Sequence, residues 1–182
     1  MNKKLILKKY ISALAGILVL VAVDQYTKLL AVRHLKDQKP LVILDGVFEL
    51  QYLENRGAAF GMLQDRRYFF VIMTVMVFVA VAYFYGITPA SRRYLPLRLC
   101  MIVVTAGAVG NFIDRIVNGY VVDFFYISVI NFPIFNVADI YVTVTFLALI
   151  LLIFFYYGEE DFAIYSRKYR KEHCAGKHDN IS

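Results

Sequence analysis

The chain contains 182 residues, of which 60% are hydrophobic, and it carries a net charge of +6 at pH 7. Its mean hydropathy of +0.58 exceeds what a soluble domain of this size can bury in its core. The composition therefore excludes an ordinary soluble domain and predicts a polytopic membrane protein.

Four segments are long and apolar enough to cross a membrane. A hydrocarbon core roughly 30 Å thick needs about 20 residues of helix. The predicted spans are Tyr10 to Val32, Tyr68 to Ile87, Leu97 to Val117 and Val137 to Gly158. We expect residues 1–158 to form one α-helical, membrane-embedded domain with an outer loop at residues 33–67. Residues 159–182 are expected to form a basic cytoplasmic tail.

Basic residues concentrate at the two ends of the chain and in the connection between the second and third spans. They are Lys3, Lys4, Lys8, Lys9, Arg92, Arg93, Arg98, Arg167, Lys168, Arg170, Lys171 and Lys177. The outer loop, by contrast, is near neutral. Because positively charged loops remain in the cytoplasm, both termini are expected to be cytoplasmic. The same basic surplus favours contact with anionic membrane lipids and argues against nucleic acid as a partner.

The first span follows several lysines, as the apolar part of a secretory signal peptide does. Its apolar run from Ile11 to Val23 ends in Asp24-Gln25 without a small-residue cleavage site, so we expect it to remain as a span. Asp24 and Lys28 stand four residues apart on one helical face. They form either an interfacial ion pair in which Lys28 snorkels outward or a support for an active site, and the sequence favours neither.

The outer loop contains a predicted β-hairpin. Residues 42–44 and 47–53 flank Asp45-Gly46, a pair typical of a tight type I′ turn, and the second segment alternates apolar and polar side chains. The pattern predicts a small extracytoplasmic sheet lying on the membrane surface. It leads into a segment whose small residues would let the backbone approach a partner or ligand closely, Asn55-Arg56-Gly57-Ala58-Ala59-Phe60-Gly61.

The third span changes character halfway along. Ala106 and Gly110 have the spacing that lets membrane helices pack closely. Asn111, Asp114 and Arg115 follow on one helical face. For the last two residues, two readings are equally supported. They form a self-compensating structural pair, or Arg115 presents its planar set of donors to a peptide carbonyl or a carboxylate.

Two further acids flank the connection to the fourth span. Asp123 lies in the aromatic and β-branched run from Tyr120 to Ile130, which predicts a short strand or re-entrant piece at the interface. Asn136 and Asp139 open the fourth span, where Asn136 is a good N-cap and Asp139 would favour the positive end of the helix dipole. Capping accounts for Asp139 taken alone but leaves Asp123, in its apolar run, unexplained.

Two carboxylates in one apolar pocket can perform acid–base hydrolysis. They cannot both be ionised at close range, so they share a proton and titrate as a unit. The ionised member would act as a general base on water. The protonated member would hydrogen-bond a peptide carbonyl and help to protonate the leaving amine.

Other hydrolytic mechanisms lack parts in this sequence. The three histidines form no His-Glu-x-x-His pattern for zinc, and Ser128 lies in no Gly-x-Ser-x-Gly frame. Cys100 and Cys174 both fall on the reducing side of the predicted topology, so they suggest neither a disulfide nor a metal framework. We therefore expect no metal and no cofactor.

Four ordered blocks resemble bacterial lipoprotein signal peptidase, also called signal peptidase II. They are Asp24-Gln25-x-x-Lys28, Asn55 to Gly61, Gly110-Asn111-Phe112-Ile113-Asp114-Arg115 with Val122-Asp123-Phe124, and Phe135-Asn136-Val137-Ala138-Asp139. The resemblance extends from the first span to about Gly158. It implies an aspartyl endopeptidase of the bacterial plasma (inner) membrane that removes signal peptides from prolipoproteins, cutting before a diacylglyceryl-modified cysteine.

The resemblance also implies roles for individual residues. Asp123 and Asp139 would form the catalytic pair near the outer face, under a cradle made by the outer hairpin. Residues that would position the substrate or the pair are Asn55, Asn111, Arg115 and Asn136. We add as candidate supporting residues Asp24, Lys28 and Asp114. The enzyme is expected to act as a monomer among membrane lipids, with the prolipoprotein signal peptide as its partner.

Two alternatives stay open at this stage. A small ion or proton transporter could use Asp24, Asp114, Asp123 and Asp139 as a relay, and an assembly factor could use polar residues only to hold helices together. A relay should spread its charges through the depth of the membrane, whereas these acids gather near one face. Clustering therefore favours the peptidase.

Overall fold

The computed structural model describes residues 3–57 and 66–165 of the chain. Its elements are α1 (Lys3–Leu35), β1 (Leu41–Leu44), β2 (Phe48–Asn55), α2 (Arg67–Ile87), η2 (Arg92–Tyr94), α3 (Leu95–Val117), β3 (Val121–Ile127), η3 (Ser128–Ile130), α4 (Val137–Phe155), α5 (Glu159–Phe162) and η4 (Ala163–Tyr165). Within these residues, α1, α2, α3 and α4 are long and apolar enough to cross a membrane. The predicted fold class, a four-helix membrane protein with a small sheet, is confirmed.

Five helix boundaries differ from the predicted spans: α2 and α3 begin one and two residues earlier, α1 ends at Leu35 rather than Val32, and the other two differences are at the start of α1 and the end of α4. α1 begins at Lys3 rather than Tyr10, because the lysines and aliphatic residues before Tyr10 are good helix formers. α4 ends at Phe155 rather than Gly158. Beyond it, the Tyr157 hydroxyl accepts the Leu97 N–H at 3.3 Å and donates to the Arg93 carbonyl at 3.1 Å. A chain that turns back to make these contacts cannot continue as a straight helix.

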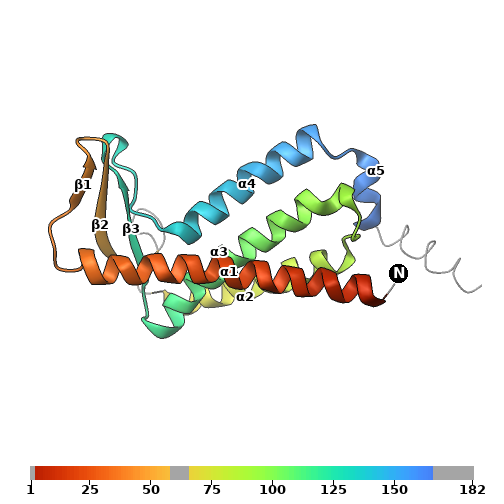
Figure 1. Ribbon diagram of the computed structural model, residues 1–182, viewed down its shortest axis with the longest axis horizontal. Helices are drawn as coiled ribbons and strands as arrows, with labels where there is room; N and C mark the ends of the chain where they lie inside the picture. Colours follow the sequence, from red (N-terminus) through yellow and green to blue (C-terminus); the bar gives the residue numbers. More distant parts are fainter. Residues whose placement is uncertain (1–2, 58–65, 166–182) are drawn as a thin grey trace, which may run out of the picture.

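α3 forms the centre of the helical bundle, with α1, α2 and α4 packed against it. Figure 1 shows the sheet at one end of α1, and α5 toward the opposite end of the bundle. α4 begins at the sheet end, where its first residues meet α1 and α3. The polar residues of α1, α3 and α4 therefore meet at one end of the bundle.

Two glycines of α3 permit this close approach. A Cβ atom at Gly107 would lie 2.6 Å from the Ala138 carbonyl oxygen of α4. A Cβ atom at Gly110 would overlap the Asp24 carboxylate of α1. The predicted close packing at Gly110 is confirmed, and its reason is that any larger residue would displace a buried carboxylate.

The sheet has the strand order β1-β2-β3, with both pairs antiparallel. The predicted hairpin is confirmed, but its turn is not the predicted type I′. Leu44 pairs with Phe48, so three residues form the loop, and Gly46 has a φ of +67°. Type I′ needs a positive φ at both central residues, and Asp45 does not adopt one. The predicted strand around Asp123 is also confirmed, as β3.

Strand alternation gives β3 two different faces. Val122 and Phe124 are 3% and 5% exposed and pack with Ala31 and Leu35 near the end of α1. Because successive side chains point to opposite faces, Asp123 points away from this apolar cluster. The sheet is therefore fixed to α1 by one face while the other face presents a carboxylate.

The end of the bundle remote from the sheet is closed by an aromatic and ionic cluster. Arg93 pairs with Asp161, with Nη2 at 2.7 Å from Oδ2 and Nε at 3.1 Å from Oδ1. Its guanidinium lies 4.2 Å from the centre of the Tyr156 ring. The Tyr94 hydroxyl donates to the Asp161 carbonyl at 2.9 Å. These contacts attach α5 to the connection between α2 and α3, whereas the basic residues after Tyr165 lie outside the described residues.

Candidate active site

Asp123 is held by an amide from the neighbouring strand. Its side chain is 2% exposed, and its Oδ2 accepts the Asn55 Nδ2 at 2.8 Å. The Oδ1 of Asn55 accepts the Gly57 N–H at 3.0 Å. Because an amide side chain has one accepting and one donating end, the Gly57 bond determines that the donor of Asn55 faces Asp123.

Asp139 lies in the first turn of α4, in a complete capping box. Asn136 Oδ1 accepts the Asp139 N–H, and Asp139 Oδ2 accepts the Asn136 N–H, both at 3.1 Å. The predicted cap is confirmed. Asn136 Nδ2 also donates to Asp123 Oδ1 at 2.5 Å. Capping α4 and linking the two carboxylates are therefore functions of the same asparagine, and one does not exclude the other.

Asn111 of α3 completes the amide network. Its Nδ2 donates to Asp139 Oδ1 at 2.9 Å. Its Oδ1 accepts Asn136 Nδ2 at 3.1 Å and Lys28 Nζ at 2.9 Å. With Asn55, three asparagines bring a donor to the carboxylates of Asp123 and Asp139, and every one has its orientation fixed by a second bond.

A cavity of about 310 Å³ opens beside the two carboxylates. Asp123 and Asp139 both line it, so the structure brings these two predicted residues together. Its apolar wall includes Phe70, Val121, Phe132, Ile134 and Phe135. An apolar cavity with a few convergent polar groups is the usual form of a ligand or substrate site.

Arg115 also lines this cavity. Its guanidinium lies 4.7 Å from the centre of the Phe70 ring of α2, and its Nη1 donates to the Asn111 carbonyl at 3.4 Å. Stacking on an aromatic face holds the guanidinium plane while leaving other donors available. Sequence reasoning did not identify Phe70, because a phenylalanine in an apolar span carries no local signal of such a contact.

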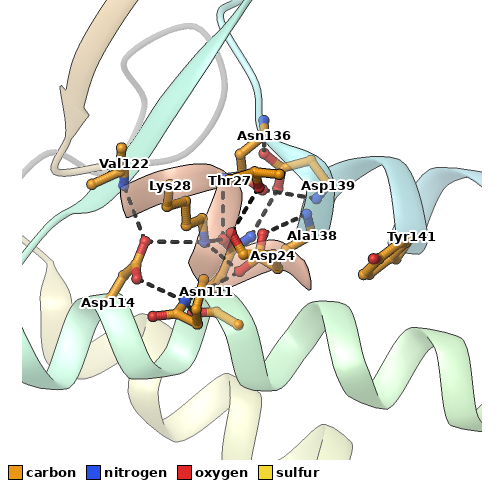
Figure 2. Close-up of polar contacts among 12 residues, drawn as sticks. Asp24, Thr27, Lys28, Asn111, Asp114, Val122, Asn136, Ala138, Asp139 and Tyr141 are labelled. Carbon is orange, nitrogen blue, oxygen red and sulfur yellow. Dashed lines mark hydrogen bonds and ion pairs between the residues drawn. The ribbon is translucent and has the colours of Figure 1, made fainter. Parts of the chain in front are cut away.

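Lys28 lies at the centre of a buried polar group that does not line the cavity, and Figure 2 shows its contacts. Its Nζ lies 2.9 Å from Asp24 Oδ2 and 3.0 Å from Asp114 Oδ2, in addition to its bond to Asn111. The three charged residues are at most 3% exposed. Buried charges are stable only when they are paired and hydrogen-bonded, and this group meets both conditions.

The two acids of this centre each hold a backbone N–H next to a cavity carboxylate (Figure 2). Asp114 Oδ2 accepts the Val122 N–H at 3.1 Å, one residue before Asp123. Asp24 Oδ1 accepts the Ala138 N–H at 2.9 Å, one residue before Asp139. Lys28 therefore joins the start of β3 to the start of α4, and so fixes the relative position of the two cavity carboxylates.

The expected ion pair of Asp24 and Lys28 forms, but two other structural expectations from the sequence are wrong. Lys28 does not snorkel outward, because it is 3% exposed and all of its partners lie inside the bundle. Asp114 and Arg115 do not pair with each other among the described residues. They are adjacent on α3 but point toward different partners, Asp114 toward Lys28 and Arg115 toward Phe70.

Gln25 belongs to the first motif block, Asp24-Gln25-x-x-Lys28, but the sequence did not indicate a role for it. Its Nε2 lies 3.2 Å from Asp24 Oδ2, 3.1 Å from the Gly110 carbonyl and 3.0 Å from Asp114 Oδ1. It therefore bridges the two buried acids, as Lys28 also does. An amide directly beside an intramembrane acid was the signal available in the sequence.

Burial raises the pKa of Asp123 to about 7, and the nearby Asp139 carboxylate adds to the rise. The amides of Asn55 and Asn136 oppose it by donating to the ionised form. The pKa therefore lies near neutrality, where a carboxyl group can hold or release a proton. Such a shift in a cavity indicates a functional site.

Part of the predicted site lies outside the described residues. This part is Ala58 to Gly61, the end of the second motif block. In the part of the chain that the structure describes, no three His, Cys, Asp or Glu side chains are arranged to hold a metal ion.

Comparison with known proteins identifies the family of this chain. Residues 16–155 match the family described as signal peptidase (SPase) II. The chain belongs to the signal peptidase II family. The lipoprotein signal peptidase of Streptococcus thermophilus strain CNRZ 1066 is 46% identical over 138 residues, which are 76% of this chain and 89% of the relative. That of Streptococcus pyogenes serotype M5 is 39% identical over 147 residues, 81% of this chain and 93% of the relative.

Solved structures agree with this assignment. Two bacterial membrane enzyme structures determined by the in meso method, at 2.3 and 1.9 Å resolution, are each 29% identical to the chain. They give TM-scores of 0.69 and 0.68 and cover 78% and 79% of this chain, or 87% and 93% of their own. As a signal peptidase II, the protein is a multi-pass bacterial membrane peptidase that cleaves signal peptides from lipoprotein precursors. These matches give no support to the transporter alternative.

Proposed function

We propose that this signal peptidase II is an aspartic endopeptidase in which Asp123 and Asp139 are the catalytic pair. The single observation that carries the proposal is that a strand and a helix terminus bring these two acids to one cavity, with Asn136 donating to both. Two carboxylates close together in a largely apolar cavity hold one proton between them. That arrangement supplies a general base and a general acid together.

The environments of the two acids assign their roles. Asp139 lies at the N-terminus of α4, where the helix dipole and the Asn136 N–H favour the ionised form. Asp123 lies on a strand with 2% exposure, and its pKa of about 7 lets it keep a proton near neutral pH. Asp139 is therefore the general base and Asp123 the general acid.

The reaction follows from these roles. Asp139 takes a proton from a water molecule as the water oxygen attacks the peptide carbonyl carbon. Asp123 donates a hydrogen bond to the carbonyl oxygen, which carries the developing negative charge. When the tetrahedral intermediate collapses, the C–N bond breaks and the amine leaves with a proton from the pair. The products are a carboxyl group on the signal peptide and a new amino terminus on the lipoprotein.

Arg115 is proposed to position the substrate. Its guanidinium faces the cavity, is held flat by Phe70, and makes no ion pair among the described residues. A fork of available donors can bind a peptide carbonyl near the scissile bond. Asn55 and Asn111 act on the carboxylates themselves, because their donors already face Asp123 and Asp139.

The proposed substrate carries a diacylglyceryl group on the cysteine that follows the scissile bond. With both termini cytoplasmic, the sheet and the cavity lie at the outer membrane face. A signal peptide is an apolar helix, and the lipid on its cysteine places the scissile bond at headgroup level. The enzyme is proposed to act as a monomer, since one chain contains every catalytic and supporting residue named here.

The test is cleavage of a purified precursor with and without the diacylglyceryl group. The expected product of the lipidated precursor begins at the modified cysteine, as measured by mass spectrometry. The unmodified precursor is expected to be cut at least about tenfold more slowly, because it loses binding energy from the buried acyl chains. Equal cleavage of both precursors would contradict the proposed substrate, although it would leave the peptidase assignment intact.

A further inference from the structure

An apolar groove lies on the helical bundle away from the active site. α1 and α2 both pack on α3, and the space between them has a volume of about 390 Å³. Its walls include Ala13 and Ile17 of α1, Phe78 and Ala82 of α2, and Ile102 and Val109 of α3. It shares no lining residue with the cavity beside Asp123 and Asp139.

The groove walls offer almost nothing to water. The Thr105 hydroxyl already donates to the Met101 carbonyl at 2.6 Å, and the Tyr85 hydroxyl donates to the Lys9 carbonyl at 3.1 Å. A water molecule needs two to four polar partners to be stable in a cavity. Hydrocarbon is therefore the better occupant of this space.

The width of the groove favours an acyl chain over an apolar helix as the occupant. A helix with its side chains is about 10–12 Å across. An extended acyl chain, which is far thinner, matches the space between two helices that both rest on a third.

Two cations lie at the α1 N-terminal end of the groove, beside Tyr10 and Tyr85. Lys9 is 6% exposed, and its Nζ donates to the carbonyls of Tyr85 at 2.5 Å and Thr88 at 2.7 Å. Arg98 Nη2 donates to the carbonyls of Ala90 and Ser91, at 3.2 and 3.1 Å. Both cations thus gather on the connection that follows α2.

These cations lack a negative partner. Among the described residues, neither Lys9 nor Arg98 forms an ion pair with a carboxylate, and the buried Nε of Arg98 has no hydrogen-bond acceptor. Lys9 Nζ donates its hydrogen bonds to backbone carbonyls, which are neutral, so its positive charge has no counter-ion among the described residues. An anion at this end of the groove would compensate both charges.

We propose that the groove is a binding site for an anionic phospholipid of the leaflet at the α1 N-terminal end. One acyl chain lies between α1 and α2, and the phosphate lies beside Arg98. In the topology proposed above, this is the cytoplasmic leaflet. A neutral lipid would fill the groove equally well but would leave the charges of Lys9 and Arg98 uncompensated.

The test is native mass spectrometry of the full-length protein released from nanodiscs that contain equal phosphatidylglycerol and phosphatidylcholine. The wild type is expected to retain phosphatidylglycerol at least about fivefold more often, since one basic residue near an anionic headgroup contributes about 1 kcal/mol. Raising the salt concentration to about 1 M should reduce this preference, because the Debye length falls to about 3 Å. Equal retention of both lipids by the wild type would overturn the proposal.

Variants distinguish binding of the acyl chain in the groove from binding of the headgroup at Arg98. Ala82→Phe fills the groove and should abolish lipid retention, whereas Val79→Phe, on the same helix but 67% exposed and outside the groove, should not. Arg98→Gln should retain lipid without headgroup preference. All three should cleave precursor within about twofold of wild type, because none touches the active site. If Ala82→Phe retained lipid as Val79→Phe does, the groove would not be the site.

Discussion

At the scale of single residues, the site is defined by which atom donates to each carboxylate oxygen. The four oxygens of Asp123 and Asp139 each accept one N–H, from Asn136, Asn55, Asn111 and the Asn136 backbone. Each asparagine is oriented by a second bond. The sequence indicated all these residues as candidates, but it could not indicate their amide orientations. These depend on three-dimensional contacts, such as that of Asn111 with Lys28 on another helix and that of Asn55 with the Gly57 N–H.

Asn136 combines two functions that substitutions can separate. Serine keeps an N-cap oxygen but has no amide to donate to Asp123, so Asn136→Ser should preserve the thermal midpoint and lose most turnover. Asn136→Ala should lose both, with about 1 kcal/mol of stability lost with the cap. Thermal unfolding in detergent and cleavage of lipidated precursor measure the two effects. Near-normal turnover of Asn136→Ser would show that the amide is not needed.

The pKa of Asp123 predicts how activity and stability depend on pH. Burial raises this pKa to about 7, from an unfolded value of about 3.9, so the folded protein binds the extra proton between these limits. The contribution of Asp123 to stability is complete below about pH 4 and is lost as the pH rises through about 7. The general acid loses its proton as the pH rises through the folded pKa, so kcat/KM should fall about tenfold per pH unit above pH 7.

Two variants check this assignment. Asn55→Ala removes a donor to the ionised form, so the alkaline limb of the kcat/KM profile should move to higher pH. In Asp123→Asn, the thermal midpoint should fall less between pH 5 and 8 than it does in the wild type. An alkaline limb that stays in place in Asn55→Ala would mean that another group controls it.

At the scale of elements, one buried cation joins the helix and the strand that carry the proposed catalytic pair. Lys28 of α1 holds Asp24 and Asp114, which in turn hold the N–H groups that precede Asp139 and Asp123. The i, i+4 spacing of Asp24 and Lys28 was visible in the sequence. The partnership with Asp114 was not, because local periodicity carries no information about a residue on another helix.

Removing this cation should destabilise the protein strongly. Lys28→Met leaves two buried carboxylates without compensation, at a cost of about 3–5 kcal/mol, and should abolish turnover as well. Lys36→Met, which breaks the exposed pair with Glu54, is the matched control and should change the thermal midpoint little. Combining Lys28→Met with Asp24→Asn and Asp114→Asn should restore stability but not full activity. If Lys28→Met were as stable as Lys36→Met, the buried centre would not hold the site together.

At the scale of the whole molecule, hydropathy predicted the four spans, and the structure confirms them, whereas the side of the membrane inferred from charge stays a prediction. Segment length and composition are local properties, which is why the spans could be inferred from sequence. The early end of α4 and the attachment of α5 through Arg93 and Asp161 arise from contacts between distant segments. Such contacts leave no periodic pattern in the chain.

The proposed orientation can be tested by cysteine labelling. In a Cys174→Ser background, where Cys100 is buried, Asp45→Cys places a thiol in the exposed hairpin turn and Ser91→Cys places one between α2 and α3. A membrane-impermeant maleimide should label Asp45→Cys in bacterial spheroplasts and Ser91→Cys only after permeabilisation. The reverse pattern would place the active site at the cytoplasmic face.

The most direct test of the catalytic pair is the turnover of lipidated precursor by Asp123→Asn and Asp139→Asn. Both variants keep the size of the side chain but cannot exchange the catalytic proton. Each should lose about 10²–10⁴-fold in turnover. Asp45→Asn, in the exposed hairpin turn, should match the wild type, and all three should show a cooperative thermal transition. Near-normal turnover by either Asp123→Asn or Asp139→Asn would contradict the aspartic mechanism.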